Sequence, residues 1–294
     1  MSGELSGYRI VERLGRGAGS EILLVADPHT ARTFALKRIV VRNPKDHRFV
    51  RQAETEYAVA GQLEHPYLRR CIAAHKVRRA LRLREYHLVM EYIDGISLQE
   101  KRPTDIAAVV DIFIKVARGL DSLHRVGYVH ADMKPNNVLI GASGTVKIID
   151  FGQSCKLGAV KNRVQGTPEF IAPEQVEKQP LDARTDVFNL GATLFWVLTG
   201  RAMETTYIRR KRSQERRGAY EDDDDPPLTV SELNPVVSEP LSRTVADCCR
   251  ANMEDRPQSM AHLIARLDAV RPESPPEGDR RTSGAASAST DSAS

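Results

Sequence analysis

The chain has 294 residues, of which 41% are hydrophobic and 28% charged, with a formal net charge of +4. This composition excludes a disordered or fibrous protein and can form a substantial core, in one large domain or in two lobes. The charge excess is too small for a dedicated nucleic-acid binder. No apolar run approaches the roughly 20 residues of a membrane span, and the N-terminus lacks a signal-peptide core, so we expect a soluble cytoplasmic protein.

Cysteine usage agrees with that compartment. The chain contains Cys71, Cys155, Cys248 and Cys249. Their spacing matches no zinc site, and the adjacent pair at positions 248 and 249 is a poor candidate for a disulfide. We therefore predict reduced thiols, as is usual for proteins of the cytoplasm.

The first part of the chain, from Tyr8 to about Ile93, is rich in predicted strands. The short β-prone runs are YRIVERL, EILLVA, TFALKRIVV and EYHLVMEYI, separated by Gly, Pro or charged clusters. One helix interrupts them at about 46–63 and ends before the His65–Pro66 pair. Its predicted apolar face has helical spacing and consists of Phe49, Ala53, Tyr57, Ala60 and Leu63.

After Asp94 the pattern changes to long helices. The first spans about 105–124, and the residues of its apolar stripe are Val109, Ile112, Val116, Leu120 and Leu123. A second, at 186–200, is apolar on almost every side and closes with Gly200, which predicts a helix buried at the centre of a lobe. We therefore predict an α+β protein with a small β-rich part followed by a larger α-helical part.

Two segments lie outside this plan. Residues 209–225 contain a basic block followed by the acidic run 221–225. Such blocks are usually solvated loops, and the less common alternative is a docking surface for a charged partner.

Residues 272–294 are rich in Ser, Pro and Ala and contain no aromatic residue and no Val, Ile or Leu. They cannot offset the entropy cost of ordering, so we predict a disordered tail.

A glycine-rich stretch, LGRGAGSEILLV, joins the first two predicted strands. Gly15, Gly17 and Gly19 would let backbone amides face phosphate oxygens, although a simple hairpin turn explains them equally well. The next elements favour the phosphate interpretation. Lys37 in FALK lies on the following strand and Glu56 on the following helix, and their ion pair would hold the ammonium near a nucleotide's phosphates.

The stretch VHADMKPNNVLI, residues 129–140, places an acid, a base and two amides between two apolar runs. It is followed by KIIDFG, GTPEFIAPE (166–174), DVFNLG (186–191) and MEDRP (253–257). In this order the elements resemble those of the eukaryotic-type (Hanks-type) serine/threonine protein kinases, over residues 8–270. The resemblance implies a bilobal protein kinase fold over 8–271, with an N-lobe at 8–93 and a C-lobe at 94–271.

The resemblance also implies roles for individual residues. Asp132 would accept the proton of a substrate hydroxyl, and Lys134 would neutralise charge on the transferred phosphoryl group. Asn137 and Asp150 would hold Mg²⁺ against the phosphates of ATP. Lys37, fixed by Glu56, would contact the α and β phosphates. Outside the chemistry, Glu174 and Arg256 resemble a buried ion pair that braces the larger lobe.

Further residues would surround the nucleotide. Met90 lies at the position that resembles the family's gatekeeper, the backbone of Glu91 and Ile93 would bind the adenine edge, and apolar side chains would cover the ring. The complete ATP-binding set implied by the resemblance is Leu14, Gly15, Arg16, Gly17, Ala18, Gly19, Ser20, Ile22, Ala35, Lys37, Glu56, Met90, Glu91, Ile93 and Leu139. Of these, Ile22, Ala35 and Leu139 would sandwich the adenine.

The catalytic loop also indicates the substrate. Lys134, two residues after Asp132, together with Thr167 resembles the serine/threonine branch of the family rather than the tyrosine-specific one. The resemblance therefore implies transfer of the γ-phosphoryl group of ATP to Ser or Thr hydroxyls of protein substrates.

Two departures from the family pattern concern Ser20, at the third glycine position, and Ala131, where most relatives have arginine. That arginine is an unpaired cation until a phosphate on the activation loop neutralises it. Between Gly152 and Ala172 the only hydroxyls are Ser154 and Thr167, and Thr167 matches a structural position. We therefore hypothesise a kinase that needs no activation-loop phosphate.

Other classes of function stay open at this point. A pseudokinase that binds nucleotide as a scaffold would need neither a base nor two metal ligands, and a small-molecule kinase would lack the APE segment and Thr167. A nucleic-acid role would rest on the arginines between 209 and 217. No aromatic residues are interleaved with them and an acidic run follows, so we expect no nucleic-acid binding.

Overall fold

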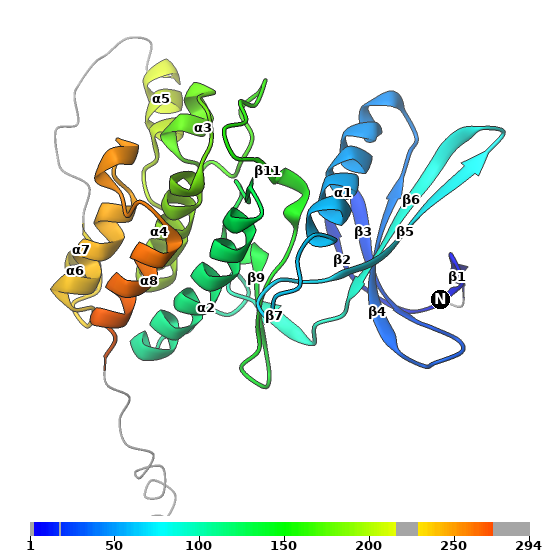
Figure 1. Ribbon diagram of the computed structural model, residues 1–294, viewed down its shortest axis with the longest axis horizontal. Helices are drawn as coiled ribbons and strands as arrows, with labels where there is room; N and C mark the ends of the chain where they lie inside the picture. The colour runs from blue at the N-terminus through cyan, green and yellow to red at the C-terminus, as the bar shows by residue number, and fades with distance from the viewer. Residues whose placement is uncertain (1–2, 18, 216–228, 273–294) are drawn as a thin grey trace, which may run out of the picture.

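The computed structural model describes residues 3–17, 19–215 and 229–272, which form two lobes. Figure 1 shows a sheet and helix α1 at one end of the molecule, most of the helices at the other, and β7 and β9 between them. The predicted α+β bilobal architecture is therefore confirmed. Of the ATP-binding residues predicted from the sequence, Ala18 lies outside the described residues.

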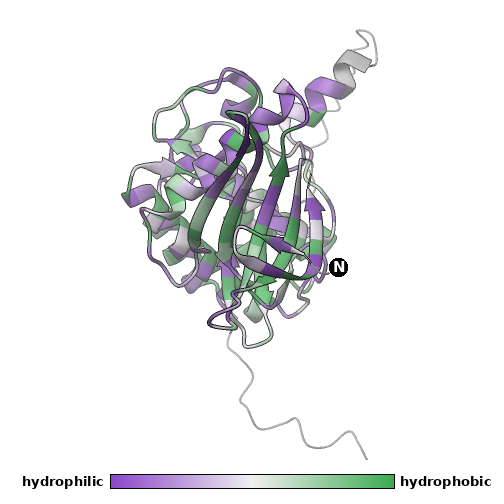
Figure 2. Cartoon of the chain, turned by 90° about the vertical axis from the view of Figure 1, so that its right-hand side faces the viewer, coloured by the Kyte–Doolittle hydropathy of each residue, from purple (hydrophilic) through white to green (hydrophobic). Residues whose placement is uncertain are grey.

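The smaller lobe is built on a six-stranded antiparallel sheet with the order β1-β2-β3-β4-β6-β5. Figure 2 shows hydrophobic and hydrophilic residues interspersed along these strands, as expected for a sheet with one covered face. The bounds are β1 Glu4–Leu5, β2 Tyr8–Gly17, β3 Ser20–Ala26, β4 Thr33–Val40, β5 Cys71–Arg79 and β6 Arg82–Glu91.

The strand β5 was not predicted from the sequence. Its residues, CIAAHKVRR, are mostly exposed or half-buried, because β5 is the edge strand and pairs only with β6. An edge strand needs few apolar residues and is often charged. The pattern therefore gave little signal, whereas the four predicted runs correspond to β2, β3, β4 and β6.

Helix α1 (His47–Ala60) begins after a short 3₁₀ turn, Pro44–Asp46, whose N-cap Asn43 accepts a hydrogen bond from the Lys45 amide. It is shorter than the predicted 46–63, and its buried face is rotated from the predicted one. Tyr57 is 38% exposed, whereas Glu56 is completely buried. The apolar pattern predicted the wrong buried face because the face of α1 that points inward carries the carboxylate of Glu56, which pairs with cations.

The larger lobe consists mainly of helices. Their bounds are α2 Ile106–Arg125, α3 Pro173–Glu177, α4 Ala183–Thr199, α5 Thr206–Glu215, α6 Val230–Leu233, α7 Glu239–Cys248 and α8 Met260–Ala269. Among the described residues, no helix is both long and apolar enough to cross a membrane. The larger lobe also contains short strands: β7 Gly95–Ser97, β8 Tyr128–Val129, β9 Val138–Gly141, β10 Val146–Ile148 and β11 Cys155–Lys156.

Helix α4 forms the centre of the larger lobe, as its composition predicted. Nearly all of its residues are buried, and it ends at Gly200, which has a φ of 72°. Its apolar side chains share one core with α2, α7 and α8, and this core continues through Leu68 and Phe151 to Ala60 at the end of α1. The two lobes are therefore joined by continuous packing close to the loops that carry the polar residues.

The charged segment 209–225 differs from the prediction where the structure describes it. Residues 206–215 form helix α5 rather than a loop, and Arg210 forms an ion pair of 2.8 Å with Glu177. The remainder, including the acidic run, lies outside the described residues, as do residues 273–294 of the predicted tail. The four cysteines are free thiols, as predicted.

We expect Gly191→Ala to lower the free energy of unfolding by about 1–3 kcal/mol, because overpacking a filled core forces neighbouring groups to move. A Cβ at Gly191 would lie 2.4 Å from Cys248 Cβ, at the contact of α4 with α7. The matched control is Gly15→Ala, since a Cβ there would meet no atom within 4 Å. Urea unfolding measures both, and equal stability of the two variants would contradict the prediction.

Candidate active site

The carboxylate of Asp132 is the centre of a compact polar cluster in the larger lobe. Lys134 Nζ donates to its Oδ2 at 2.9 Å, and Thr167 Oγ1 donates to its Oδ1 at 3.2 Å. Lys134 Nζ also donates to Thr167 Oγ1 at 3.0 Å. Asn137 Nδ2 donates to the backbone carbonyl of Asp132 at 2.8 Å, which fixes the turn that follows. Three residues predicted from the sequence thus lie together, with Thr167 in contact.

The backbone of this loop is held by a residue from α4. Asp186, which is fully buried, accepts hydrogen bonds of 2.8 Å from the amides of His130 and Ala131 and one of 2.7 Å from His124 Nε2. Ala131 has a φ of 59°, a left-handed conformation that is unfavourable for a residue with a Cβ. Because Asp186 binds both amides, it stabilises the strained turn that presents Asp132.

Lys37 lies at the junction of the lobes between two carboxylates. Its Nζ is 2.7 Å from Glu56 Oε2 and 3.4 Å from Asp150 Oδ1. Strand β4 supplies Lys37, helix α1 supplies Glu56, and the start of the Phe151–Gln153 turn supplies Asp150. The ion pair predicted from their order in the sequence is therefore present.

Lys37 and Asp150 alter each other's pKa. Burial of the Lys37 ammonium favours a lower pKa, but the adjacent carboxylates of Glu56 and Asp150 outweigh it and raise the pKa above its usual value. The Lys37 ammonium in turn holds the pKa of Asp150 well below its usual range. Lys37 and Asp150 are thus both charged at neutral pH, as binding of phosphates and cations requires.

Asn137 and Asp150 fit the donor set of a hard divalent cation. Asn137 uses its Nδ2 for the Asp132 carbonyl, which leaves its oxygen as the atom available to a cation. The Asp150 side chain is 41% exposed and its Oδ1 accepts from Lys37 and from the Gly152 amide. The described residues contain no cluster of three or more His, Cys, Asp or Glu that could hold a metal. A cation here would therefore need phosphate oxygens to complete its shell.

The glycine-rich stretch forms the hairpin between β2 and β3, in which Gly17 pairs with Ser20. Gly19 packs against α1 so closely that a Cβ would lie 2.2 Å from the ring of Phe49. Leu14 and Arg16 are exposed and Gly15 is half-buried. Glycine at position 19 is thus explained by packing as well as by the phosphate-binding interpretation.

The predicted adenine-binding residues lie on neighbouring strands. In the sheet Ala35 pairs with Met90, and Ile22 pairs with Lys37. Met90 is fully buried, and the Glu91 amide donates to the Arg70 carbonyl, so this amide is not available to a ligand. Ile93 is half-buried in the connection from β6 to β7, and Leu139 is half-buried on β9 of the other lobe.

Sequence reasoning missed several residues that support this site. Asp186 lies in the quoted DVFNLG segment but was given no role, and Gln175 donates to the Ala131 carbonyl at 2.9 Å. Arg69 contacts the second oxygen of Glu56 at 2.8 Å. Arginine at position 69 gives no signal in the sequence, because charged residues before an edge strand are usually solvated. Its contact depends on how the chain folds back onto α1.

The predicted ion pair of the larger lobe is confirmed. Arg256 donates to both carboxylate oxygens of Glu174, at 2.9 and 3.0 Å, and both residues are buried. The guanidinium also lies over the ring of Phe188, 4.9 Å from its centroid. This pair joins the segment after Thr167 to the C-terminal part of the lobe.

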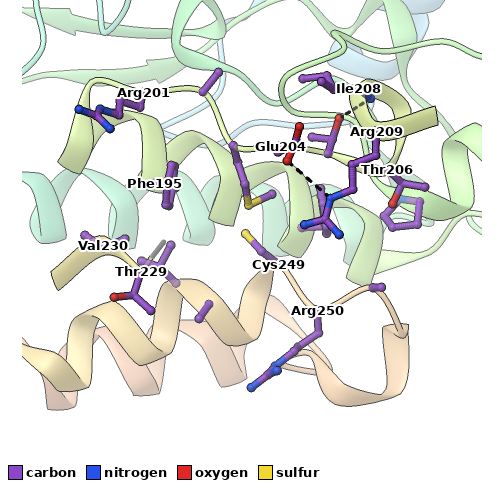
Figure 3. A pocket seen from close by; sticks show the side chains of 18 of the residues that line it. Phe195, Arg201, Glu204, Thr206, Ile208, Arg209, Thr229, Val230, Cys249 and Arg250 are labelled. Carbon is purple, nitrogen blue, oxygen red and sulfur yellow. Dashed lines mark hydrogen bonds and ion pairs between the residues drawn. The ribbon is translucent and has the colours of Figure 1, made fainter. Parts of the chain in front are cut away.

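A cavity of about 950 Å³ lies in the larger lobe, separate from the cluster around Asp132. Figure 3 shows Phe195 and Cys249 beside it and Arg201, Arg209 and Arg250 on different sides of it. Arg209 is 3.9 Å from Glu204. A second, smaller cavity of about 390 Å³ adjoins Lys134 and Thr167 directly. The smaller cavity is therefore the one associated with the candidate chemistry.

We expect Asp186→Asn to lower the free energy of unfolding by about 1–3 kcal/mol, because the amide cannot accept from both backbone N–H groups and leaves one buried and unpaired. Burial alone would raise the pKa of Asp186, but its hydrogen bonds hold the pKa below the usual 3.8. The contribution of ionised Asp186 to the free energy of unfolding is thus fully present above about pH 4, and it is lost as the pH falls through the lowered pKa.

Urea unfolding at several pH values measures this effect, and the gap between the wild type and Asp186→Asn should narrow below about pH 4. Asp111→Asn is the control, since Asp111 is a surface residue that pairs with Arg271 at 3.0 Å and has a side chain 49% exposed. A gap that stays constant on acidification would contradict the assigned role of Asp186.

Comparison with known proteins gives concordant results. The family model described as "Protein kinase domain" matches residues 8–266. The serine/threonine-protein kinase PknB of Mycobacterium tuberculosis is 29% identical over 283 residues, which cover 93% of this chain and 44% of that protein. The serine/threonine-protein kinase PrkC of Bacillus subtilis is 28% identical over 202 residues, covering 66% and 30%. The chain spans less than half the length of these relatives.

Among solved structures, a mutant form of the kinase domain of Mycobacterium tuberculosis PknI matches with a TM-score of 0.67 and 23% identity. The match covers 91% of this chain and 97% of that one, and it supports the fold. The matched family model covers nearly all of the described residues, including the loops around Asp132 and Asp150. The chain therefore belongs to the protein kinase family.

Proposed function

We propose that this chain is a serine/threonine protein kinase, which transfers the γ-phosphoryl group of ATP to Ser or Thr hydroxyls of protein substrates in a magnesium-dependent reaction. The observation that carries the proposal is the Asp132 carboxylate, held by Lys134 and Thr167 at 2.9 and 3.2 Å. A scaffold without catalysis would not need this arrangement. The relatives PknB and PrkC bear the name serine/threonine-protein kinase.

In this mechanism each residue has a distinct task. Asp132 orients the substrate hydroxyl and accepts its proton as the oxygen attacks the γ-phosphorus, while the bond from the γ-phosphorus to the bridging oxygen breaks and ADP leaves. Lys134, which lies beside that carboxylate, neutralises charge on the transferred phosphoryl group. Lys37 contacts the phosphates that remain with ADP. The protein forms no covalent bond with the transferred phosphoryl group. Protein kinases therefore accelerate this reaction mainly by positioning the reactants and by stabilising the charge of the transition state.

Protein kinases use ATP with a divalent metal ion, and we propose Mg²⁺ here, held by the Asn137 oxygen and the Asp150 carboxylate. When bound, the ion neutralises the phosphate oxygens and orients the triphosphate. The lowered pKa of Asp150 keeps this carboxylate ionised at neutral pH. The carbonyl of Asp132 keeps the Asn137 amide oriented through a hydrogen bond of 2.8 Å.

The preference for Ser and Thr hydroxyls is supported by Thr167. Its hydroxyl contacts both Asp132 and Lys134, so the segment that follows lies against the catalytic loop. The cavity of about 390 Å³ beside Lys134 is also lined by Phe170 and Trp196. A side chain next to the phosphorylated residue of a protein substrate would fit this cavity.

The proposed kinase does not need activation-loop phosphate. Ala131 removes the cation that such a phosphate would neutralise, and its site is filled by packing with Val129, Cys155 and Leu181. Ser154 is buried, and Thr167 is engaged with Asp132. The segment is held instead by its own contacts. Strand β11 pairs with β8, and Lys161 donates to the Gln153 carbonyl at 2.5 Å.

The test of the activity is mass spectrometry after incubation with ATP, Mg²⁺ and a generic basic protein. We expect phosphoserine and phosphothreonine in the protein substrate, with a rate reduced at least about a hundredfold in Asp132→Asn, because loss of the base removes proton transfer. ATP binding without transfer by the wild type would instead favour the scaffold.

Independence from loop phosphate has its own test. We expect protein treated with phosphatase to keep its rate within about twofold, since position 131 carries no cation that a loop phosphate would neutralise. Ser154→Ala serves as the control that removes the remaining loop hydroxyl. A treated protein with almost no turnover, restored when the loop is phosphorylated, would refute this part of the proposal.

A further inference from the structure

The carboxylate of Glu56 contacts two cations, although the proposed mechanism uses only one. Lys37 Nζ lies 2.7 Å from its Oε2, and an amino group of Arg69 lies 2.8 Å from its Oε1. Glu56 has no exposed surface and the Arg69 side chain is 9% exposed. Each oxygen of this buried carboxylate therefore has a separate cationic partner.

Arg69 is fixed through its backbone to the larger lobe. Its amide donates to the Ile148 carbonyl at 3.0 Å, and the Ile148 amide donates to the Tyr67 carbonyl at 2.8 Å. Leu68 forms a parallel bridge with Ile148 on strand β10. Asp150 follows two residues after Ile148. The side chain of Arg69 thus joins α1 to the strand that leads directly into Asp150.

The burial of Arg69 is not explained by a full set of hydrogen bonds. Its Nε is buried and has no hydrogen-bond partner among the residues that the structure describes. The nearby Cys71 cannot supply a charge, because burial raises the pKa of its thiol to about 12. Glu56 is therefore the carboxylate that forms an ion pair with this buried guanidinium.

We propose that Arg69 is a positioning residue that holds Glu56, and with it α1, in the orientation that presents Lys37 to the nucleotide. The proposal rests on the kinase function proposed above. When phosphates attract the Lys37 ammonium, its pairing with Glu56 weakens, and a buried carboxylate left without a cation is strongly destabilised. Arg69 keeps Glu56 paired at that stage, because its guanidinium is always protonated.

The consequence is a site that is assembled before nucleotide or any partner arrives. Helix α1 is held on one side by Arg69, and it packs against the turn after Asp150, where a Cβ on Gly152 would be 3.3 Å from Gln52 Cβ. Both contacts are made within the part of the chain that the structure describes.

The experiment compares Arg69→Met with Arg70→Met in the full chain. Methionine keeps a long apolar side chain but removes the charge, and Arg70 is the matched neighbour, with a side chain 51% exposed and 3.9 Å from Glu64. We expect Arg69→Met to raise the Kd of an Mg²⁺-bound non-hydrolysable ATP analogue by about tenfold or more. Arg70→Met should stay within about twofold, and Arg69→Lys should recover part of the loss by restoring the charge.

Hydrogen exchange of the nucleotide-free protein gives a readout that does not depend on activity. We expect faster exchange in α1, residues 47–60, in Arg69→Met and unchanged exchange in α4. If Arg69→Met does not fold, Arg69→Lys carries the test, and its shorter side chain should give smaller changes in the same direction. A folded Arg69→Met variant with unchanged Kd and unchanged exchange in α1 would overturn the proposal. A variant whose Tm falls while Kd and exchange in α1 stay unchanged would overturn it as well.

Coupling to Glu56 gives the final criterion. In a Glu56→Gln background the carboxylate is already absent, so adding Arg69→Met should raise the analogue Kd by less than about twofold. A further tenfold increase would show that Arg69 acts elsewhere and would refute its assignment. A wild-type chain that transfers no phosphate would count against the proposed kinase function, whereas exchange in α1 would still report on Arg69.

Discussion

The charge of Glu56 is the constraint on which the rest of the site depends. It is a fully buried carboxylate at the junction of the lobes, and such a group is stable only beside cations. Lys37 reaches it from the sheet and Arg69 from the segment joined to the larger lobe. Pairing this one carboxylate therefore sets the position of α1, of the β4 lysine and, through Lys37, of Asp150.

The catalytic loop depends on a second buried acid. Asp186 binds the amides of His130 and Ala131, and the strained conformation at Ala131 turns Asp132 toward Lys134 and Thr167. Glu56 and Asp186 thus hold the two halves of the candidate site from opposite lobes. Continuous apolar packing through Leu68 and Phe151 lies between them, so the two halves keep a defined relative position.

Contacts of Ala131 and of Lys161 both hold the activation segment in place. A small apolar residue at 131 packs with Val129 and Leu181, so this position carries no cation that a phosphate would have to neutralise. Lys161 binds a carbonyl of the same segment, and a short strand pair anchors its start. These contacts are local to the chain, which is consistent with a site organised by folding rather than by modification.

Much of this protein could be predicted from the sequence, because several signals are local. The β-prone runs and the helix closed by Gly200 follow from neighbours within a few positions. The roles of the polar residues at 132, 134, 137 and 150 were implied by the resemblance to a family, which rests on the order of short motifs along the chain. The pairing of Lys37 with Glu56 could be inferred from their order on a strand and the next helix. Such patterns depend on side-chain period and turn chemistry, which are properties of short segments.

Other features were decided only by the tertiary structure. Edge strand β5 and helix α5 are highly charged, so their patterns did not indicate strand or helix. The roles of Arg69 and Asp186 were invisible, since each depends on a partner distant in the sequence that becomes close only when the lobes pack. A charged residue looks solvated in a sequence, and only burial beside an opposite charge or backbone amides gives it a structural role.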